Sequence, residues 1–237
     1  MKKKNLYKRA FRLKESNCTI ISDKESAIEK AISSIKHHRR QLEKYIKEHP
    51  RFFYSLEPVP VDNEPKVARL MAEASAKADV GPMAAVAGVL ADLAVEEMIS
   101  NGCKVAVVEN GGEVSAISNQ PIDIALAAGD APLSKEMGFR LKEFPVGVAT
   151  SSGLYSHALS FGDAEAVTIF AVDAGVADAA ATAVANLIKG DDVRGVIRRG
   201  IDRALSIDGV KGVFILYRGV VGKAGQVPEL IKVNPQR

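Results

Sequence analysis

The chain has 237 residues, of which 47% are apolar and 26% are charged, and its net charge is +3. This length and composition exclude extensive disorder and predict a compact globular protein with one large core or two small ones. Its two cysteines, Cys18 and Cys103, form no CxxC motif, so we expect neither a disulfide framework nor a zinc site, and a reducing cytoplasm fits best.

We expect a cytoplasmic protein without a membrane partner. The basic residues 1–14 are not followed by the apolar stretch of a signal peptide. The longest apolar run, residues 82–91, is too short to cross a bilayer.

Positive charge is concentrated near the N-terminus. Residues 1–51 hold 15 Lys and Arg against 6 Asp and Glu, which gives +9 there and −6 in the rest of the chain. Such an asymmetry can mark a surface for nucleic acid or for an acidic partner. However, residues 23–49 place isoleucine and leucine at spacings of three, four and seven, which predicts an amphipathic helix with a charged solvent face. We therefore expect no nucleic-acid binding, while an interaction module using this helix, or a homodimer, stays an alternative.

Short patterns predict the elements around that helix. Residues 6–13 and 18–22 read as two strands, and Asp23 is placed to cap the helix, which ends before Pro50. Residues 52–65 contain three prolines, so we expect an irregular connector there.

The rest of the chain interleaves helices and strands without strict alternation. Helices are predicted at residues 64–78, 83–100, 176–189 and 191–206. Strands are predicted at residues 104–109, 113–118, 122–128, 146–151 and 166–172, and a closing hairpin at residues 212–225. This order predicts the α+β class, with mixed or antiparallel sheets layered against helices. We expect an N-terminal unit, residues 1–62, and a body, residues 63–237, that form one integrated domain. The alanine-rich helices at 83–99 and 176–189 fit either an old duplication or alanine composition alone.

The segment VDAGVADAAATAVANLIKG, residues 172–190, contains the most informative pair of side chains. Asp178 and Thr182 are four residues apart, so on a helix both side chains project from one face. A carboxylate and a hydroxyl suit Mg²⁺, which prefers oxygen ligands and keeps water or phosphate in its shell. The structural alternative is an aspartate that stabilises the helix and a threonine that fills a gap in close packing.

Four glycine-flanked turns at the ends of predicted elements could hold phosphate oxygens through backbone N–H groups and short hydroxyls. They are ADVGPMAA (78–85), ENGGEV (109–114), ATSSGLYSH (149–157) and AGVADAAAT (174–182). In this order they resemble the ApbE-type flavin transferases and, more closely, an uncharacterised ApbE-like family of bacteria and archaea that is distantly related to them. The resemblance covers roughly residues 70–190.

The resemblance implies an ApbE-like fold and a Mg²⁺-dependent site for FAD or FMN. It makes Asp178 and Thr182 the side-chain ligands of Mg²⁺, with the carbonyl group of Pro82 as the backbone ligand. The residues that it assigns to the flavin nucleotide are Asp79, Gly81, Asn110, Gly111, Gly112, Glu113, Thr150, Ser151, Ser152, Gly153 and Tyr155. For an enzyme, it implies transfer of FMN from FAD to a serine or threonine of an acceptor protein, or cleavage of FAD into FMN and AMP.

The chain departs from the family pattern at three points. Ala85 takes the place of the lysine in the family's Asp-x-Gly-x-x-x-Lys segment, which removes a positive charge near the diphosphate. Glu113 replaces the aspartate of the Gly-Gly-Asp turn. The family's Asp-Pro-x-Thr-Gly segment is replaced by ALSFGDAE, residues 158–165. The first and third departures favour a non-catalytic flavin carrier or sensor as the rival of an enzyme.

Other interpretations stay open for single residues. Asp79 could cap the helix that begins near Pro82, and the Asn-Gly-Gly sequence could be an ordinary hairpin turn. The catalytic candidates are Asp178 and His157. A serine nucleophile at 151 or 152 with His157 as its base lacks both a G-x-S-x-G motif and an assignable acid.

Overall fold

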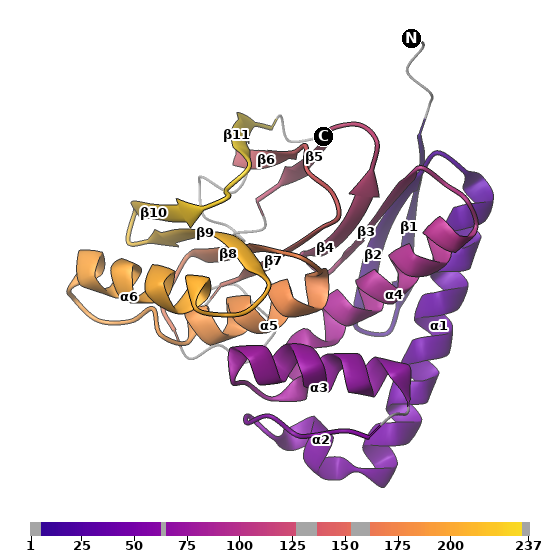
Figure 1. Cartoon of the computed structure of the whole chain (residues 1–237), viewed down its shortest axis with the longest axis horizontal. Coiled ribbons are helices and arrows are strands. Elements are labelled where there is room, and N and C mark those ends of the chain that lie inside the picture. Colours follow the sequence, from indigo (N-terminus) through magenta and orange to yellow (C-terminus); the bar gives the residue numbers. More distant parts are fainter. Residues whose placement is uncertain (1–5, 63–64, 127–136, 153–161, 234–237) are drawn as a thin grey trace.

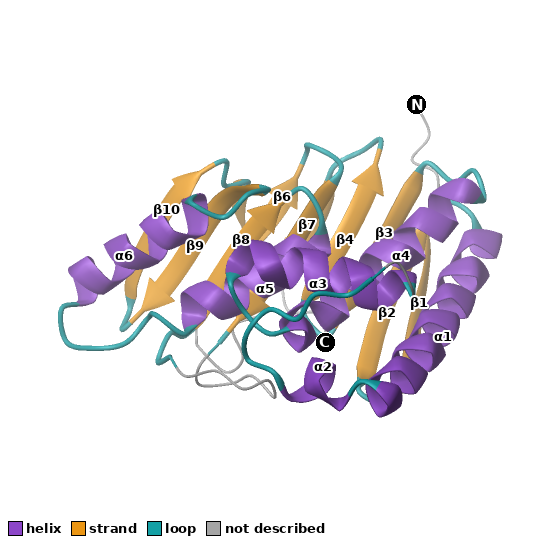
Figure 2. Ribbon diagram, turned by 60° about the horizontal axis from the view of Figure 1, so that its bottom comes forward, coloured by secondary structure: helices purple, strands orange, loops and turns teal. Residues whose placement is uncertain are grey.

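The computed structural model describes residues 6–62, 65–126, 137–152 and 162–233. Helices cover one face of an eight-stranded sheet, and a three-stranded sheet packs against the other face (Figure 1). Figure 2 shows the helix layer in front of the large sheet, with α1 near β1 and β2 and α6 near β9 and β10. The predicted α+β class is confirmed, and all sheet neighbours are antiparallel.

The large sheet has the strand order β1-β2-β3-β4-β7-β8-β9-β10. Its strands are β1 (Tyr7–Leu13), β2 (Ser16–Ser22), β3 (Val105–Asn110), β4 (Glu113–Ser118), β7 (Val146–Ser151), β8 (Ala166–Ala171), β9 (Val210–Tyr217) and β10 (Val220–Gly225). The small sheet, in the order β11-β6-β5, contains β5 (Ile122–Ala125), β6 (Met137–Leu141) and β11 (Glu229–Lys232). The sequence analysis missed β6 and β11, because both are short and β11 has no buried residue to mark an apolar pattern.

The helices follow the predicted ranges closely, with two local corrections. They are α1 (Glu25–Glu48), α2 (Pro50–Tyr54), α3 (Lys66–Ala78), the 3₁₀ helix η1 (Pro82–Ala85), α4 (Val86–Ser100), α5 (Ala174–Ala185) and α6 (Val193–Leu205). The expected N-cap of α1 is wrong: Lys24 occupies that position, and the Asp23 carboxylate accepts hydrogen bonds from the N–H groups of Lys104 and Val105 instead. The expected connector begins as α2, because Pro50 fits the first turn of a helix.

The topology repeats once along the chain. Two strands, then helices, then two strands make up residues 7–118, and the same order recurs in residues 146–225. The two four-stranded halves meet between β4 and β7, in the middle of the large sheet. In this repeat α4, which precedes β3, corresponds to α6, which precedes β9. The similar composition of α4 and α5 is therefore not explained by the repeat.

Strand alternation assigns the central side chains to two cores. Val114 on β4 and Val148 on β7 pack toward the small sheet, together with Phe139. Ala149 of β7 lies in the other core, which α3, α4, α5 and α6 share. Because side chains alternate along a strand, Glu113 of β4 faces the helices, as does Ser151 of β7.

Two helices cross at the seam between the halves with their backbones in direct contact. A Cβ atom added at Gly88 of α4 would collide with the backbone carbonyl of Ala174, and one added at Gly175 of α5 would lie 2.7 Å from Cγ2 of Val89. Only glycine fits such an approach, so the crossing fixes how far apart α4 and α5 lie.

We expect Gly88→Ala to lower the free energy of unfolding by about 3 kcal/mol, because the new methyl group must push α4 and α5 apart. Chemical denaturation measures the change. Glu97→Ala, at an exposed position of the same helix, is the control and should stay within about 0.5 kcal/mol of the unaltered protein. Equal stability of both variants would show that the crossing tolerates expansion.

Candidate functional site

Asp178 and Thr182 are the two residues of α5 that keep partial exposure to solvent. The other ten residues of this helix are buried. Because the two side chains are four residues apart, they occupy one face of the helix, one turn from each other. The predicted pair is therefore neither sealed in the core nor divided between two faces of the helix.

The Asp178 carboxylate lies at the N-terminal end of α4. Its Oδ2 atom accepts a hydrogen bond from the N–H of Gly88 at 3.0 Å, and the N–H of Ala87 is a second donor to the carboxylate. Burial nevertheless dominates and raises the pKa of Asp178 from 3.8 to about 7, while these N–H groups oppose the shift. The carboxylate is thus held in place by the backbone of another helix.

Glu113, the first residue of β4, brings a second carboxylate to the same region. Burial, followed by the negative charge of Asp178, raises the pKa of Glu113 well above its ordinary value, and the charge of Glu109 adds to the shift. Because each negative charge disfavours ionisation of the other acid, a cation bound nearby would stabilise the ionised form of both. The Glu113 carboxylate therefore lies within electrostatic reach of Asp178.

The Asn110 to Glu113 segment forms the predicted hairpin between β3 and β4. Gly111 and Gly112 both have positive φ, as a two-residue turn of this kind requires. Their N–H groups already have partners: Gly111 donates to the carbonyl of Asn17 and Gly112 to the carboxylate of Glu109. A phosphate that used these N–H groups would have to displace both contacts.

Asn110 ties the hairpin to the helix layer. Its side-chain amide donates to the carbonyl of Ala87 at 3.1 Å, and its Oδ1 atom accepts a hydrogen bond from the thiol of Cys18. This buried side chain therefore supports the backbone segment whose N–H groups hold Asp178. Its structural role is established by these contacts, whereas its assignment to the nucleotide stays a prediction.

The Thr150 to Tyr155 segment is only partly described. The Thr150 hydroxyl hydrogen-bonds to that of Thr168 at 2.9 Å, and strand alternation places this pair on the sheet face opposite α5. Ser151 faces the helices, and Ser152 is buried. Gly153, Tyr155 and His157 lie outside the described residues.

The turn before α4 contains the remaining predicted residues. Asp79 has φ 56° and ends α3 as its C-cap, so it does not cap the following helix, whose first turn is preceded by Gly81. Asp79 is exposed, whereas Gly81 and Pro82 are buried. Ala85, which the resemblance aligns with a lysine, has no exposed surface at all. A lysine at this position would have to enter the core.

The oxygen donors of this region fit Mg²⁺. Asp178 offers carboxylate lone pairs beyond the one used by Gly88, and the Thr182 hydroxyl lies one turn away. Within the described ranges, no group of three or more His, Cys, Asp and Glu side chains could hold a metal ion by itself. A small protein share is what Mg²⁺ tolerates, since it retains several waters and substrate phosphates.

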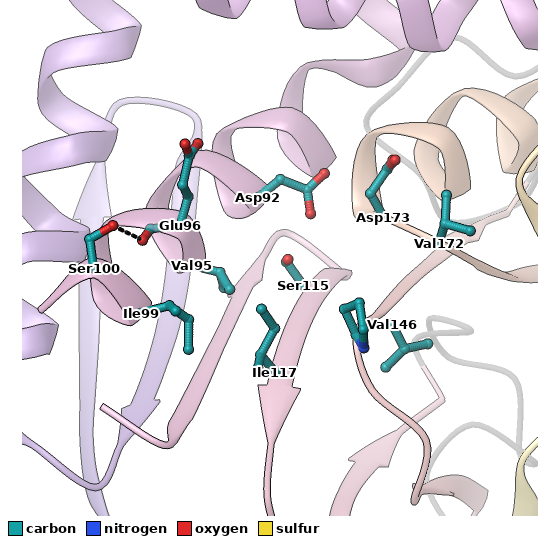
Figure 3. Close-up of a pocket in the computed structure, with 11 residues that line it drawn as sticks. Asp92, Val95, Glu96, Ile99, Ser100, Ser115, Ile117, Val146, Val172 and Asp173 are labelled. Atoms are coloured by element: carbon teal, nitrogen blue, oxygen red, sulfur yellow. Dashed lines mark hydrogen bonds between the residues drawn. The ribbon is translucent and has the colours of Figure 1, made fainter. Parts of the chain in front are cut away.

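A pocket of about 340 Å³ opens farther along β4, away from Glu113. Figure 3 shows the carboxyl groups of Asp92 and Asp173 on one side of this pocket and the apolar side chains of Ile117 and Val146 on the other. No residue predicted for the flavin or for Mg²⁺ lines it. The pocket therefore lies outside the set of residues predicted to bind the flavin and Mg²⁺.

Sequence reasoning missed Asp92, which lies on α4 between buried neighbours. Its two oxygens accept hydrogen bonds from the N–H groups of Ala174 at 3.0 Å and Gly175 at 2.8 Å. Burial raises the pKa of Asp92 to about 6, the nearby charge of Asp173 adds to the shift, and the Ser115 hydroxyl opposes it. A single acid within an otherwise apolar helix segment was the available signal.

Solved structures with the same architecture define the class of fold. The crystal structure of the ApbE protein of Thermotoga maritima superposes with a TM-score of 0.67 at 17% identity, over 93% of this chain and 97% of that one. The apo flavinyl transferase ApbE of Pseudomonas stutzeri gives a TM-score of 0.64 at 15% identity, over 95% and 97% of the two chains. The protein thus has the ApbE fold, as the resemblance implied.

The family follows from closer sequence matches. The model described as AbpE bacteria matches residues 2–209, and the chain belongs to this family. A UPF0280 protein of Methanococcus maripaludis strain C7 is 40% identical over 227 residues, which cover 94% of this chain and 92% of the relative.

None of the described helices is by itself both long and apolar enough to cross a bilayer. Only α3 and the η1–α4 segment together have the length and composition of a span, and they are bent by 101° at the break between them.

We expect the metal-free protein to lose stability as the pH rises from 5 to 8. The pKa of Asp178 is about 7 in the folded protein against 3.8 ordinarily, so the folded state holds a proton that the unfolded state has released. The stabilisation is complete below pH 4 and disappears as the pH passes 7. Asp178→Asn should flatten this dependence by about 2 kcal/mol.

Denaturant unfolding at a series of pH values, with a metal chelator present, measures the two slopes. Comparison with the variant cancels the contributions of groups that do not interact with Asp178, such as His38, whose pKa is lowered by burial. The contribution of Glu113 changes together with that of Asp178, because the charge of Asp178 raises the pKa of Glu113. Parallel slopes for the two proteins would contradict the assigned environment of Asp178.

Proposed function

We propose that the protein binds a flavin nucleotide, FAD or FMN, in a Mg²⁺-dependent manner. The observation that carries this proposal is the exposure pattern of α5, which is buried everywhere except at Asp178 and Thr182. A helix selected for packing alone would not need two hard-oxygen side chains on its one accessible face.

Each part of the candidate site would contribute differently to such a complex. Asp178 and Thr182 would hold Mg²⁺, with the Pro82 carbonyl as the backbone ligand. Glu113 adds negative charge that favours the cation, and Asp79, Gly81 and Ser151 would contact the nucleotide with the Asn110 to Gly112 turn. Asn110 fixes Ala87 and thereby the N-terminal end of α4, against which Asp178 rests. When bound, Mg²⁺ would supply positive charge to the diphosphate oxygens.

The chemistry that fits this site is substitution at the FMN phosphorus of FAD. The bond between this phosphorus and the bridging diphosphate oxygen breaks, and AMP leaves with that oxygen. A new bond forms from the phosphorus to the hydroxyl oxygen of a serine or threonine on an acceptor protein, which loses its proton, or to water. The first case yields a flavinylated acceptor and the second yields free FMN.

The comparisons support this proposal at the level of fold and family. The Pseudomonas stutzeri protein with the same fold is described as a flavinyl transferase. At 15% identity this similarity establishes a shared fold and no more. The substrate and the reaction are therefore proposed for this chain from its own residues.

One observation favours a flavin carrier or sensor as the second candidate. At position 85, where the resemblance implies a lysine, the chain has a completely buried alanine, so no lysine side chain meets the diphosphate there. A carrier would retain the flavin and release no AMP, which separates the two functions in one experiment.

We expect the unaltered protein to bind FAD more tightly with Mg²⁺ than with a chelator. Thr182→Val keeps the shape of the side chain but removes its hydroxyl, so it should weaken the apparent Mg²⁺ affinity by about tenfold or more. Titration calorimetry at fixed FAD measures this change. Thr19→Val, at a comparably half-buried threonine on β2, is the matched control and should bind as the unaltered protein does.

Chromatography of the same mixtures then separates the two candidate functions. AMP released in step with FMN or with labelled acceptor identifies an enzyme, and intact FAD retained by the protein identifies a carrier. FAD binding that is the same with Mg²⁺ and with chelator, and unaffected by Thr182→Val, would refute the proposed cation site.

A further inference from the structure

A second aspartate, Asp92, holds the helix that carries the proposed Mg²⁺ ligands. We propose that Asp92 is a positioning residue, which sets the place of Asp178 and Thr182 by anchoring the first turn of α5 to α4. This inference rests on the proposed function, because it assigns Asp92 a role in that same cation site.

The anchor is a fork between one carboxylate and two consecutive backbone N–H groups. Oδ1 of Asp92 accepts from Ala174 at 3.0 Å, and Oδ2 accepts from Gly175 at 2.8 Å. The Ser115 hydroxyl of β4 is a third partner of the carboxylate. Two bonds in one plane fix direction as well as distance, so the first turn of α5 cannot rotate without breaking one of them.

The contact is reciprocated across the same crossing. Asp92 of α4 binds the N-terminal N–H groups of α5, while Asp178 of α5 binds the N–H of Gly88 near the start of α4. A carboxylate at a helix N-terminus is favoured by the free N–H groups and by the helix dipole. Each helix therefore supplies a carboxylate that accepts hydrogen bonds from N–H groups of the other helix.

The backbone contact makes this arrangement stiff. Gly88 lies directly on the Ala174 carbonyl, and Gly175 lies against Val89, so the two helices cannot move closer. The two carboxylates in turn oppose separation. Asp178 is three residues beyond Gly175 on the same helix, so any displacement of the first turn also displaces Asp178.

The first turn of α5 also has an anchor within its own chain segment. Asp173 caps the helix by accepting from the N–H of Val176 at 2.7 Å. This bond preserves the helix but does not tie it to α4. Loss of Asp92 should therefore leave α5 folded while its position relative to α4, and thus to the Pro82 turn, becomes less defined.

The test is Asp92→Asn, which keeps the size of the side chain but turns one N–H group of the amide toward an N–H group of α5. Asp23→Asn is the control at a second aspartate that accepts from two consecutive N–H groups, those of Lys104 and Val105, at 2.9 and 3.1 Å. There Oδ1 alone accepts both bonds, so an amide oxygen can keep them, and Asp23→Asn should lower the melting temperature less than Asp92→Asn does. We expect only Asp92→Asn to weaken Mg²⁺ binding at fixed FAD, by about tenfold, because substitutions of residues that hold metal ligands in place usually have an effect of this size.

The affinity for FAD measured with a chelator provides the readout that separates positioning from general damage. It should change by less than twofold in Asp92→Asn, because the change acts through the cation ligands alone. Ser115→Ala, which removes one partner of the Asp92 carboxylate, is a milder variant and should weaken Mg²⁺ binding by a smaller factor in the same direction.

Three results would overturn the inference. Unchanged Mg²⁺ affinity in folded Asp92→Asn refutes it and leaves the proposed function standing. If Asp92→Asn does not fold, unchanged Mg²⁺ affinity in Ser115→Ala refutes it in the same way. Absence of Mg²⁺ binding by the unaltered protein refutes the proposed function, and the inference falls with it.

Discussion

The direct contact between the backbones of α4 and α5 is the constraint on which the rest of the structure depends. Gly88 and Gly175 allow the approach, and Asp92 and Asp178 each satisfy N–H groups of the opposite helix. Carboxylates placed in this way lose hydration, which is why the pKa values of both acids rise despite their backbone partners. The closest helix packing and the two buried carboxylates therefore occur at the same crossing of α4 and α5, and the candidate cation site lies beside it.

The repeated topology explains why the candidate site lies where it does. Each half supplies four strands to the large sheet, and the halves join between β4 and β7. The hairpin with Glu113 comes from the first half, and Asp178 with Thr182 comes from the second. A ligand held by both would bridge the seam, so the two halves must join before the site exists.

The sequence predicted the parts of the structure that depend on local patterns. The Asn-Gly-Gly hairpin, the α+β class and the shared face of Asp178 and Thr182 follow from turn chemistry, periodicity and helical spacing. Whether the sheets are mixed or antiparallel stayed open. The sequence could not predict contacts between distant segments. Asp23 binds Lys104 rather than capping α1, the N–H groups of Gly111 and Gly112 are already used, and Asp92 holds α5. Each of these depends on which elements become neighbours, and no single segment contains that information.

The reciprocal hold between α4 and α5 also bears on how such a chain can change over generations. Loss of either acid leaves buried N–H donors without a partner on the other helix. We therefore expect substitutions in the segments around residues 86–92 and 173–182 to be correlated rather than independent. A mutational library that varies the two segments jointly should therefore recover folded members that separate libraries never reach.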